Sequence, residues 1–208
     1  MSTPGGPSQG RGPEGRGART RLRIEEAALR LFASRGVAGT SVRDIAEAVG
    51  VSEGALYRHF PSKEELARAL FLERYADLAQ QILKLKQRDM PLSRQLGRVV
   101  ELGCALFDEE PALFAYLLIN QHDHLAHVPD DPERNAVSAL AVLLETGGSA
   151  PPQPPALAAA MVLGLLVQPA VFALYGRLDG PLMRHAPAIS EAMLRALGLA
   201  PIEGGDGA

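Results

Sequence analysis

The sequence predicts an all-α protein with nine or ten helices: an N-terminal three-helix domain with a helix-turn-helix, then a C-terminal helical bundle. Two observations support this fold class. Apolar residues recur at spacings of three and four along most of the 208-residue chain, which is the period of an amphipathic helix. No segment shows the alternation of apolar and polar residues that is typical of a strand, and no internal repeat is visible.

The region 40–66 carries the pattern of a helix-turn-helix. Gly50 lies between two short apolar-patterned segments and suits the left-handed conformation that ends one helix and turns into the next. Ser52 can cap the second segment by accepting an amide hydrogen bond from its first turn, and Ser62 can cap the long helix that follows. Two short helices joined by a sharp turn define this motif. The residues predicted to face its core include Val42, Ile45, Ala46, Val49, Leu56 and Phe60.

The second helix of such a motif enters the major groove of DNA with its N-terminal half toward the base edges. Ser52 and Glu53 are therefore candidate readers of bases, and Glu53 suits a cytosine amino group. Gly54 and Ala55 are small enough for a close approach, and Ala55 can touch a thymine methyl group. The other candidate DNA contacts are Thr40, Ser41 and Arg43 around the first short helix, Tyr57, Arg58 and His59 on the second, and Lys63 at the start of the third.

The run DIAEAVGVSEGALYRHFPSKEEL, residues 44–66, resembles the DNA-binding signature of the TetR family of bacterial transcriptional regulators. The resemblance covers roughly residues 19–74. It implies that Tyr57 and His59 lie at positions that contact phosphates or bases. It also implies a ligand-responsive regulator, a repressor in most cases, that binds double-stranded operator DNA. The C-terminal domain of such proteins binds a small effector and pairs two copies through its last two long helices.

We therefore expect four parts. Residues 1–18 form a disordered arm, 19–66 the helix-turn-helix domain with the fourth helix linking from residue 62, 67–200 the ligand-binding and dimerisation domain, and 201–208 a flexible tail. The net charge is +3 over residues 1–74 and −6 over the remainder, so the basic end suits a polyanion such as DNA. Two identical reading heads predict a palindromic operator.

The C-terminal part shows no paired nucleophile and base and no phosphate-binding loop, so we expect no enzyme and no cofactor. Helical bundles can hold a largely apolar cavity with a few polar groups. The aromatic and thioether side chains are the candidates for contact with a small, largely apolar effector. They are Phe107, Phe114, Tyr116, Met161, Phe172 and Tyr175.

The segment QHDHLAH, residues 121–127, leaves a second reading open, in which a metal-dependent helical enzyme uses the cluster His122 to His127. We favour a polar loop without metal, because the segment lies between predicted helices and lacks a regular ligand spacing. Cys104 is the only cysteine, so no internal disulfide can form, and this fits a reducing cytoplasm. We expect a cytoplasmic protein with an inert, buried thiol at this position.

Residues 156–175 are apolar and long enough to span a membrane. Gln168 and Pro169 interrupt the segment, and no basic residue flanks its start, so we expect a helix buried in a core or an interface and no membrane partner. Its apolar character all round predicts that it forms a homodimer interface together with a last helix over 188–197.

Overall fold

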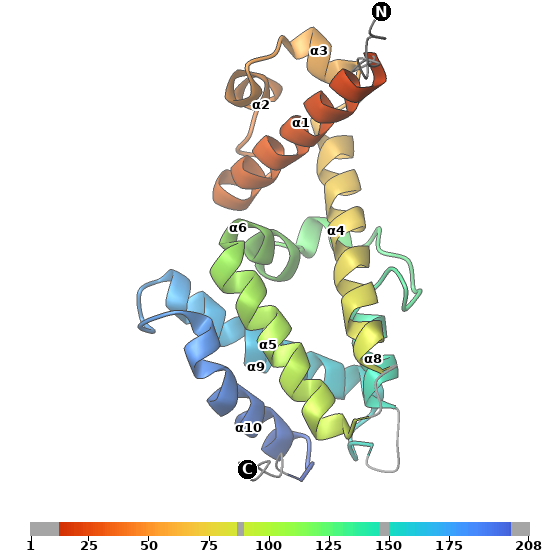
Figure 1. Ribbon diagram of the computed structural model, residues 1–208, viewed down its shortest axis with the longest axis vertical. Helices are drawn as coiled ribbons and strands as arrows, with labels where there is room; N and C mark the ends of the chain where they lie inside the picture. The colour runs from red at the N-terminus through yellow and green to blue at the C-terminus, as the bar shows by residue number, and fades with distance from the viewer. Residues whose placement is uncertain (1–12, 87–89, 146–149, 201–208) are drawn as a thin grey trace, which may run out of the picture. The chain divides into compact units, whose positions relative to one another are not determined.

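The structure, a computed structural model, describes residues 13–86, 90–145 and 150–200, with the side chains of 13–16, 122 and 123 not described. Over these ranges it contains helices and turns but no strand (Figure 1), so the all-α prediction is confirmed. The contacts divide the chain into two compact units, and the boundary between them in the sequence falls between Ala67 and Arg68. The sequence placed this boundary after residue 66.

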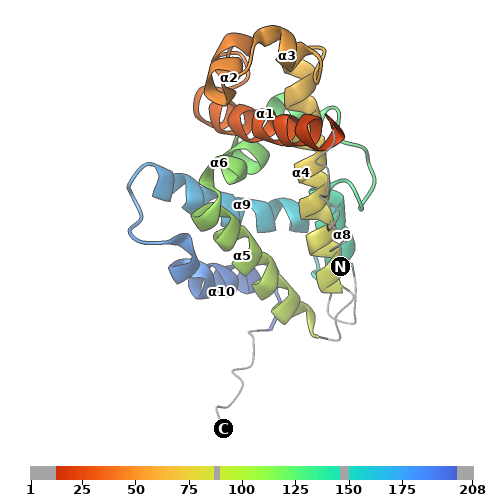
Figure 2. The ribbon, with the colours of Figure 1, turned by 45° about the horizontal axis from the view of Figure 1, so that its top comes forward.

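The first unit contains α1 (Pro13–Arg35), α2 (Val42–Val49), α3 (Glu53–Tyr57) and the beginning of α4 (Lys63–Lys86). In Figure 2, α1 lies beside α2 and α3, and the three helices share one apolar core. The helices α1 and α2 contribute residues at helical spacing, as the sequence pattern predicts, and α3 contributes Leu56. The core residues are Ile24, Ala27, Ala28, Phe32, Ile45, Ala46, Val49, Leu56 and Phe60.

The start of α1 differs from the prediction. The helix begins at Pro13 rather than near Arg19, so residues 13–18 belong to it and not to a disordered arm. Proline suits the first turn of a helix because its missing amide hydrogen would have no partner there. Once the buried turns around Ile24 are formed, each further residue adds a hydrogen bond without a new nucleation step. The rest of the predicted arm and the predicted tail lie outside the described residues.

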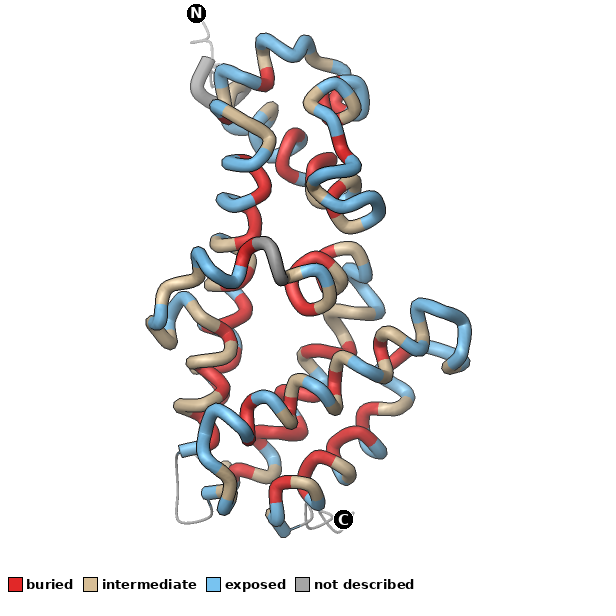
Figure 3. The backbone as a smooth tube through the Cα atoms, turned by 180° about the vertical axis from the view of Figure 1, so that it is seen from behind, coloured by how far each residue is buried: buried red, intermediate tan, exposed pale blue. Residues whose placement is uncertain are grey.

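The second unit contains the remainder of α4 and eight further elements. In order these are α5 (Leu92–Glu109), α6 (Pro111–Phe114), a π-helical turn η1 (Ala115–Ile119), α7 (His122–Leu125), α8 (Ala136–Leu144), α9 (Pro155–Leu174), a 3₁₀ turn η2 (Leu182–His185) and α10 (Ala186–Ala196). The core lies where α9 packs against α5, α8 and α10. Figure 3 shows buried residues recurring along these helices between exposed ones, as one-sided burial requires.

Two local features shape this unit between α5 and α9. The helix α6 gives way to η1, where the Asn120 amide donates to the Ala115 carbonyl at 2.8 Å. A bond to the fifth residue back marks a π turn, which inserts one extra residue into the helical ladder. Farther along the chain, Asn135 caps α8 and accepts hydrogen bonds from the amides of Val137 and Ser138.

The helix α9 has two different sides. Within the described residues it is the one helix whose length and composition would allow it to cross a membrane, and 28% of its most apolar window is buried. Its buried side is made of Ala158, Ala159, Val162, Leu166 and Ala170. Its other side carries Leu157 and Phe172, which are 51% and 52% exposed. In one copy of the chain, much of this apolar helix therefore has no cover.

The helices α5 and α9 approach each other closely at Gly103. A β-carbon built on Gly103 would lie 2.3 Å from Cδ2 of Leu166, a side chain that is only 4% exposed. That distance is far below van der Waals contact, so the glycine allows the two helices to approach each other.

Gly103→Ala is expected to lower the free energy of unfolding by about 1 kcal/mol, because the strain of overpacking exceeds the gain in helix propensity. Chemical denaturation monitored by circular dichroism measures this difference. Gly17→Ala is the matched control, because Gly17 lies in the helix α1 and its built β-carbon meets nothing within 4 Å. The control should retain or gain stability, and equal stability gains in both variants would contradict the close approach.

Candidate DNA-binding site

The helix α2 is fixed at its start by a reciprocal pair of hydrogen bonds. The Ser41 hydroxyl accepts from the Asp44 amide at 3.1 Å, and the Asp44 carboxylate accepts from the Ser41 amide at 2.8 Å. This capping box satisfies two amides that would otherwise lack partners at the helix start. The Ser41 hydroxyl also donates to Asp44 at 2.6 Å, and the hydrogen bonds from the Ser41 side chain and backbone lower the pKa of Asp44.

The turn between α2 and α3 depends on Gly50. Its φ angle is 73°, in the left-handed region that residues with a β-carbon rarely adopt. The Gly50 and Val51 amides donate to the carbonyl of Ala46 at 2.9 and 3.0 Å. These bonds close the end of α2 and direct the chain sharply into α3.

The helix α3 is held by its two ends and by α1. Ser52 caps it by accepting from the Ala55 amide at 3.2 Å, while Leu56 is completely buried. The guanidinium of Arg21 lies 4.6 Å from the centre of the Phe60 ring, in the geometry of a cation–π contact. Arg23 donates to the carbonyl of Val49. The sequence pattern did not indicate these two arginines, because their partners are distant in the chain.

These anchors leave one face of α3 in solvent. Ser52, Glu53 and Gly54 are exposed, and a β-carbon built on Gly54 would meet nothing within 4 Å. Tyr57 is 49% exposed, although a large aromatic ring is costly to leave in water without a partner. The remaining candidates on this helix are Ala55 and His59, which are half-buried, and Arg58, which is exposed.

Two cationic candidates flank this face. Arg43 is exposed on α2 and its Nε donates to Glu47 Oε1 at 2.8 Å, and this hydrogen bond raises the pKa of Arg43. The Lys63 side chain is 16% exposed at the start of α4, with its Nζ 3.6 Å from Glu64. The Arg43–Glu47 pair is exposed on both sides and therefore weak, so Arg43 can exchange its partner for a phosphate. The distance from Lys63 to Glu64 is longer than a hydrogen bond, so the ammonium group of Lys63 can still donate to a phosphate.

Thr40 does not belong to the exposed set. It is 1% exposed, and its hydroxyl donates to the carbonyl of Gly36 at 2.9 Å. We therefore correct its assignment as a DNA contact. The sequence shows a hydroxyl residue beside a helix start, but the Ser41 side chain takes the capping role. Thr40 instead closes the turn after α1.

The six predicted effector contacts lie in different surroundings. Phe107 and Phe114 pack edge to face with 5.3 Å between ring centres. Tyr116 is buried beside Phe71, with 5.9 Å between ring centres, and burial raises the pKa of its hydroxyl. Phe172 and Tyr175 are 52% and 77% exposed, while Met161 is half-buried. Their contact with an effector stays a prediction.

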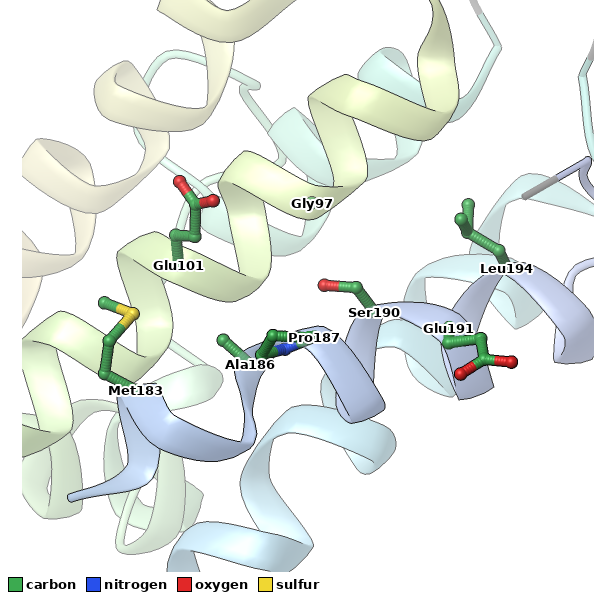
Figure 4. Close-up of a pocket in the computed structure, with 8 residues that line it drawn as sticks. All are labelled: Gly97, Glu101, Met183, Ala186, Pro187, Ser190, Glu191 and Leu194. Carbon is green, nitrogen blue, oxygen red and sulfur yellow. The ribbon is translucent and has the colours of Figure 1, made fainter. Parts of the chain in front are cut away.

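A groove that the sequence did not indicate lies in the second unit between α5 and α10. Its volume is about 580 Å³, which is within the usual range for small-molecule sites. Figure 4 shows Gly97 and Glu101 on α5 facing Met183, Ala186 and Ser190 on η2 and α10. Its lining residues come from helices that are far apart in the sequence, and none of the six predicted residues is among them. The groove is completed by Pro187, Glu191 and Leu194.

The segment 121–127 is not simply a polar loop, as the sequence suggested. It contains the short helix α7, and His124 is only 7% exposed. The His124 Nε2 lies 3.2 Å from the Tyr116 hydroxyl, and its ring centre lies 4.9 Å from that of Phe71, with the two rings tilted. Among the described residues, no three His, Cys, Asp or Glu side chains gather as metal ligands. The described part of this segment therefore supports packing rather than a metal centre.

Cys104 is buried on α5, as the sequence predicts. Burial, together with the negative charges of Asp108 and Glu101, raises the pKa of its thiol to about 11. The thiolate is the reactive form of cysteine, so this group is chemically inert at neutral pH.

Comparisons with known proteins first concern the N-terminal region. The family model for bacterial regulatory proteins of the tetR family matches residues 24–70, from α1 into α4. The HTH-type transcriptional regulator TtgR from Pseudomonas putida is 57% identical over 51 residues. That match spans 24% of this chain and 24% of TtgR, so the likeness to this curated relative concerns about a quarter of its length.

Solved structures extend the likeness over most of the chain. A TetR family transcription regulator from Marinobacter aquaeolei has a TM-score of 0.72 at 25% identity, with 88% of this chain and 98% of that chain covered. A structure presented as the "molecular basis for control of antibiotic production by a bacterial hormones" is 31% identical, with a TM-score of 0.64. It is matched over 86% of this chain and 97% of its own. From the matched helix-turn-helix and this likeness, the chain belongs to the tetR family of bacterial regulatory proteins, whose named members are transcriptional regulators rather than enzymes.

Proposed function

We propose that this protein is a cytoplasmic transcriptional repressor that binds palindromic operator DNA as a homodimer and is released when a small molecule binds its C-terminal unit. The observation that carries the DNA-binding role is the exposed face of α3, a helix that is capped by Ser52 and anchored by the buried Leu56. A short helix with this support can enter a major groove without rearrangement. The match of residues 24–70 to the tetR family model also supports a DNA-binding role.

The residues around α3 divide into two kinds of contact. Glu53 and Ser52 at its N-terminal end are the candidate readers of base edges, and small Gly54 permits close approach. Arg43 and Lys63 at the flanks are candidates for phosphates, which fix orientation but carry no base information. Ser41, Ala55, Tyr57, Arg58 and His59 complete the proposed DNA-binding set.

The uncovered side of α9 supports the homodimer. Leu157, Phe172 and Tyr175 lie on the side opposite the buried alanines and are about half or more exposed. Large apolar groups at this density are unfavourable in water and are typical of protein interfaces. The exposed Gly164 between them allows two helices to approach closely. We infer that a second copy of α9, together with α10, supplies the missing cover.

Two observations support the effector role. One similar structure is presented as the basis of control by a bacterial hormone, and we infer by analogy a small-molecule signal for this chain. The second unit also contains a groove of about 580 Å³, large enough for such a ligand.

The first prediction concerns the operator. Selection of bound duplexes from a random DNA pool should return an inverted repeat, because a two-fold dimer presents two identical copies of α3. The half-site centres should be about one helical turn apart, roughly 34–36 Å, or a small multiple of that. Recovery of a single asymmetric site bound by one protomer would contradict the proposal.

The second prediction concerns Lys63. Lys63→Ala should weaken binding to selected and unrelated duplexes by the same factor, because a phosphate contact does not read sequence. A dimer loses two contacts, so the slope of log K against log salt concentration should fall by about two. Lys84→Ala, an exposed lysine in the last turn of the same helix, is the matched control. An unchanged slope for Lys63→Ala would show that this side chain does not face the DNA backbone.

The third prediction concerns the dimer. Leu157→Arg and Phe172→Arg place a charge on the exposed side of α9, so each should give folded monomers by light scattering and normal circular dichroism. DNA affinity should fall with the dimer, since two linked heads bind much more tightly than one. Leu125→Arg, at a 38% exposed leucine on α7, should remain dimeric. If both α9 variants also remain dimeric, the interface lies elsewhere.

A further inference from the structure

The groove between α5 and α10 has an apolar floor with a single hydroxyl. Gly97 is buried on α5, and its missing side chain leaves space opposite α10. Ala186 is likewise small and buried, and Met183 provides a flexible thioether at one end. In Figure 4 the Ser190 side chain extends from α10 toward α5. These features suit an apolar molecule that lies between the two helices.

The charges along this groove have one sign. Among the described residues, its charged lining consists of Glu101 from α5 and Glu191 from α10, with no lysine, arginine or histidine. Arg98 and Arg195 contact these carboxylates at 2.6 and 2.7 Å, with side chains 57% and 68% exposed. Such exposed pairs stabilise little, so a cation in the groove can share or replace the arginine. An anion would find no cationic side chain among these lining residues.

One wall of the groove is held in place by hydrogen bonds between Asp108 and the start of η2. Asp108 at the end of α5 accepts hydrogen bonds from the Leu182 amide at 2.7 Å and the Met183 amide at 2.9 Å. A carboxylate that accepts two amides at a helix start is a strong cap, because it also complements the positive end of the helix. The contact fixes η2, and with it Met183, beside α5. The groove is therefore a formed site rather than a gap between loosely packed helices.

We propose that this groove binds a small amphiphile with an apolar body and one positive charge, such as a quaternary ammonium or a protonated lipophilic amine. The apolar body lies over Gly97 and Ala186, and the cation lies beside Glu101 or Glu191 at the rim. That this ligand is the effector rests on the proposed function, whereas its binding in the groove does not.

Isothermal titration calorimetry with decyltrimethylammonium, decanol and decanoate, all below their aggregation concentrations, tests the charge preference on one alkyl chain. The ammonium should bind at least about tenfold more tightly than decanoate, and its affinity should fall with salt while that of decanol does not. Glu101→Gln and Glu191→Gln should each weaken ammonium binding by about threefold and leave decanol unchanged. Equal affinities for ammonium and decanoate would overturn the proposal.

Two further variants separate the groove from general surface effects. Glu73→Gln, at an exposed glutamate on α4 outside the groove, should leave ammonium binding unchanged. Ala186→Leu fills the groove and should abolish binding of ammonium and decanol alike, with circular dichroism used to confirm the fold. Retained binding in a folded Ala186→Leu variant would overturn the site. Absence of ammonium binding by the native protein would also overturn it, for instance because a second copy covers the groove.

A measurement of DNA release by the same ammonium distinguishes the two proposals. Decyltrimethylammonium should release the native protein from its selected duplex, and the Glu101→Gln variant should need about threefold more. A protein that binds the ammonium in the groove but binds no duplex would refute the proposed function and leave the site intact. A protein that binds its duplex but does not bind the ammonium would refute the site and leave the proposed function intact.

Discussion

The burial of Leu56 and Phe60 is the interaction on which the DNA-binding face depends. The helix α3 has five residues, far fewer than a helix needs to be stable alone in water. Its conformation therefore depends on the buried side chains of Leu56 and Phe60 and on the cap at Ser52, rather than on hydrogen bonds within the helix. Because these anchors lie elsewhere, Glu53 and Gly54 on the outer face make none of the contacts that hold the helix. Their identity is free to follow the sequence of the DNA.

Local features of the chain account for the parts of the fold that the sequence predicts well. The cap at Ser41, the left-handed turn at Gly50 and the start of α4 at Lys63 each depend on residues within four positions of one another. The same is true of the periodic apolar stripe that defines α5. Rules based on spacing and capping therefore recover these elements, with errors of a few residues at helix ends, as at the start of α1.

Contacts between distant residues account for what the sequence does not predict. His124 is buried because Tyr116 and Phe71 surround it, and no pattern within 121–127 contains that information. Thr40 and Ser41 are both hydroxyl residues at a helix start, yet only one of them reaches solvent. The groove between α5 and α10 is likewise a product of tertiary packing. A list of aromatic residues is a poor guide to such a site, since the space here exists where side chains are small.

The π turn at η1 has a consequence for how this unit tolerates change in chain length. A π turn contains one residue more than the α-helical ladder requires, and here that residue lies within Ala115–Ile119. Deletion of a single residue within this turn would restore the regular α-helical hydrogen-bond pattern. The residues on one side of the deletion would then rotate by about 100° relative to those on the other. Tyr116 could not keep both its helical neighbours and its hydrogen bond to His124. A deletion that improves the local helix would thus dismantle the buried aromatic group against α4, and insertions and deletions should be far rarer in this turn than in the loops around it.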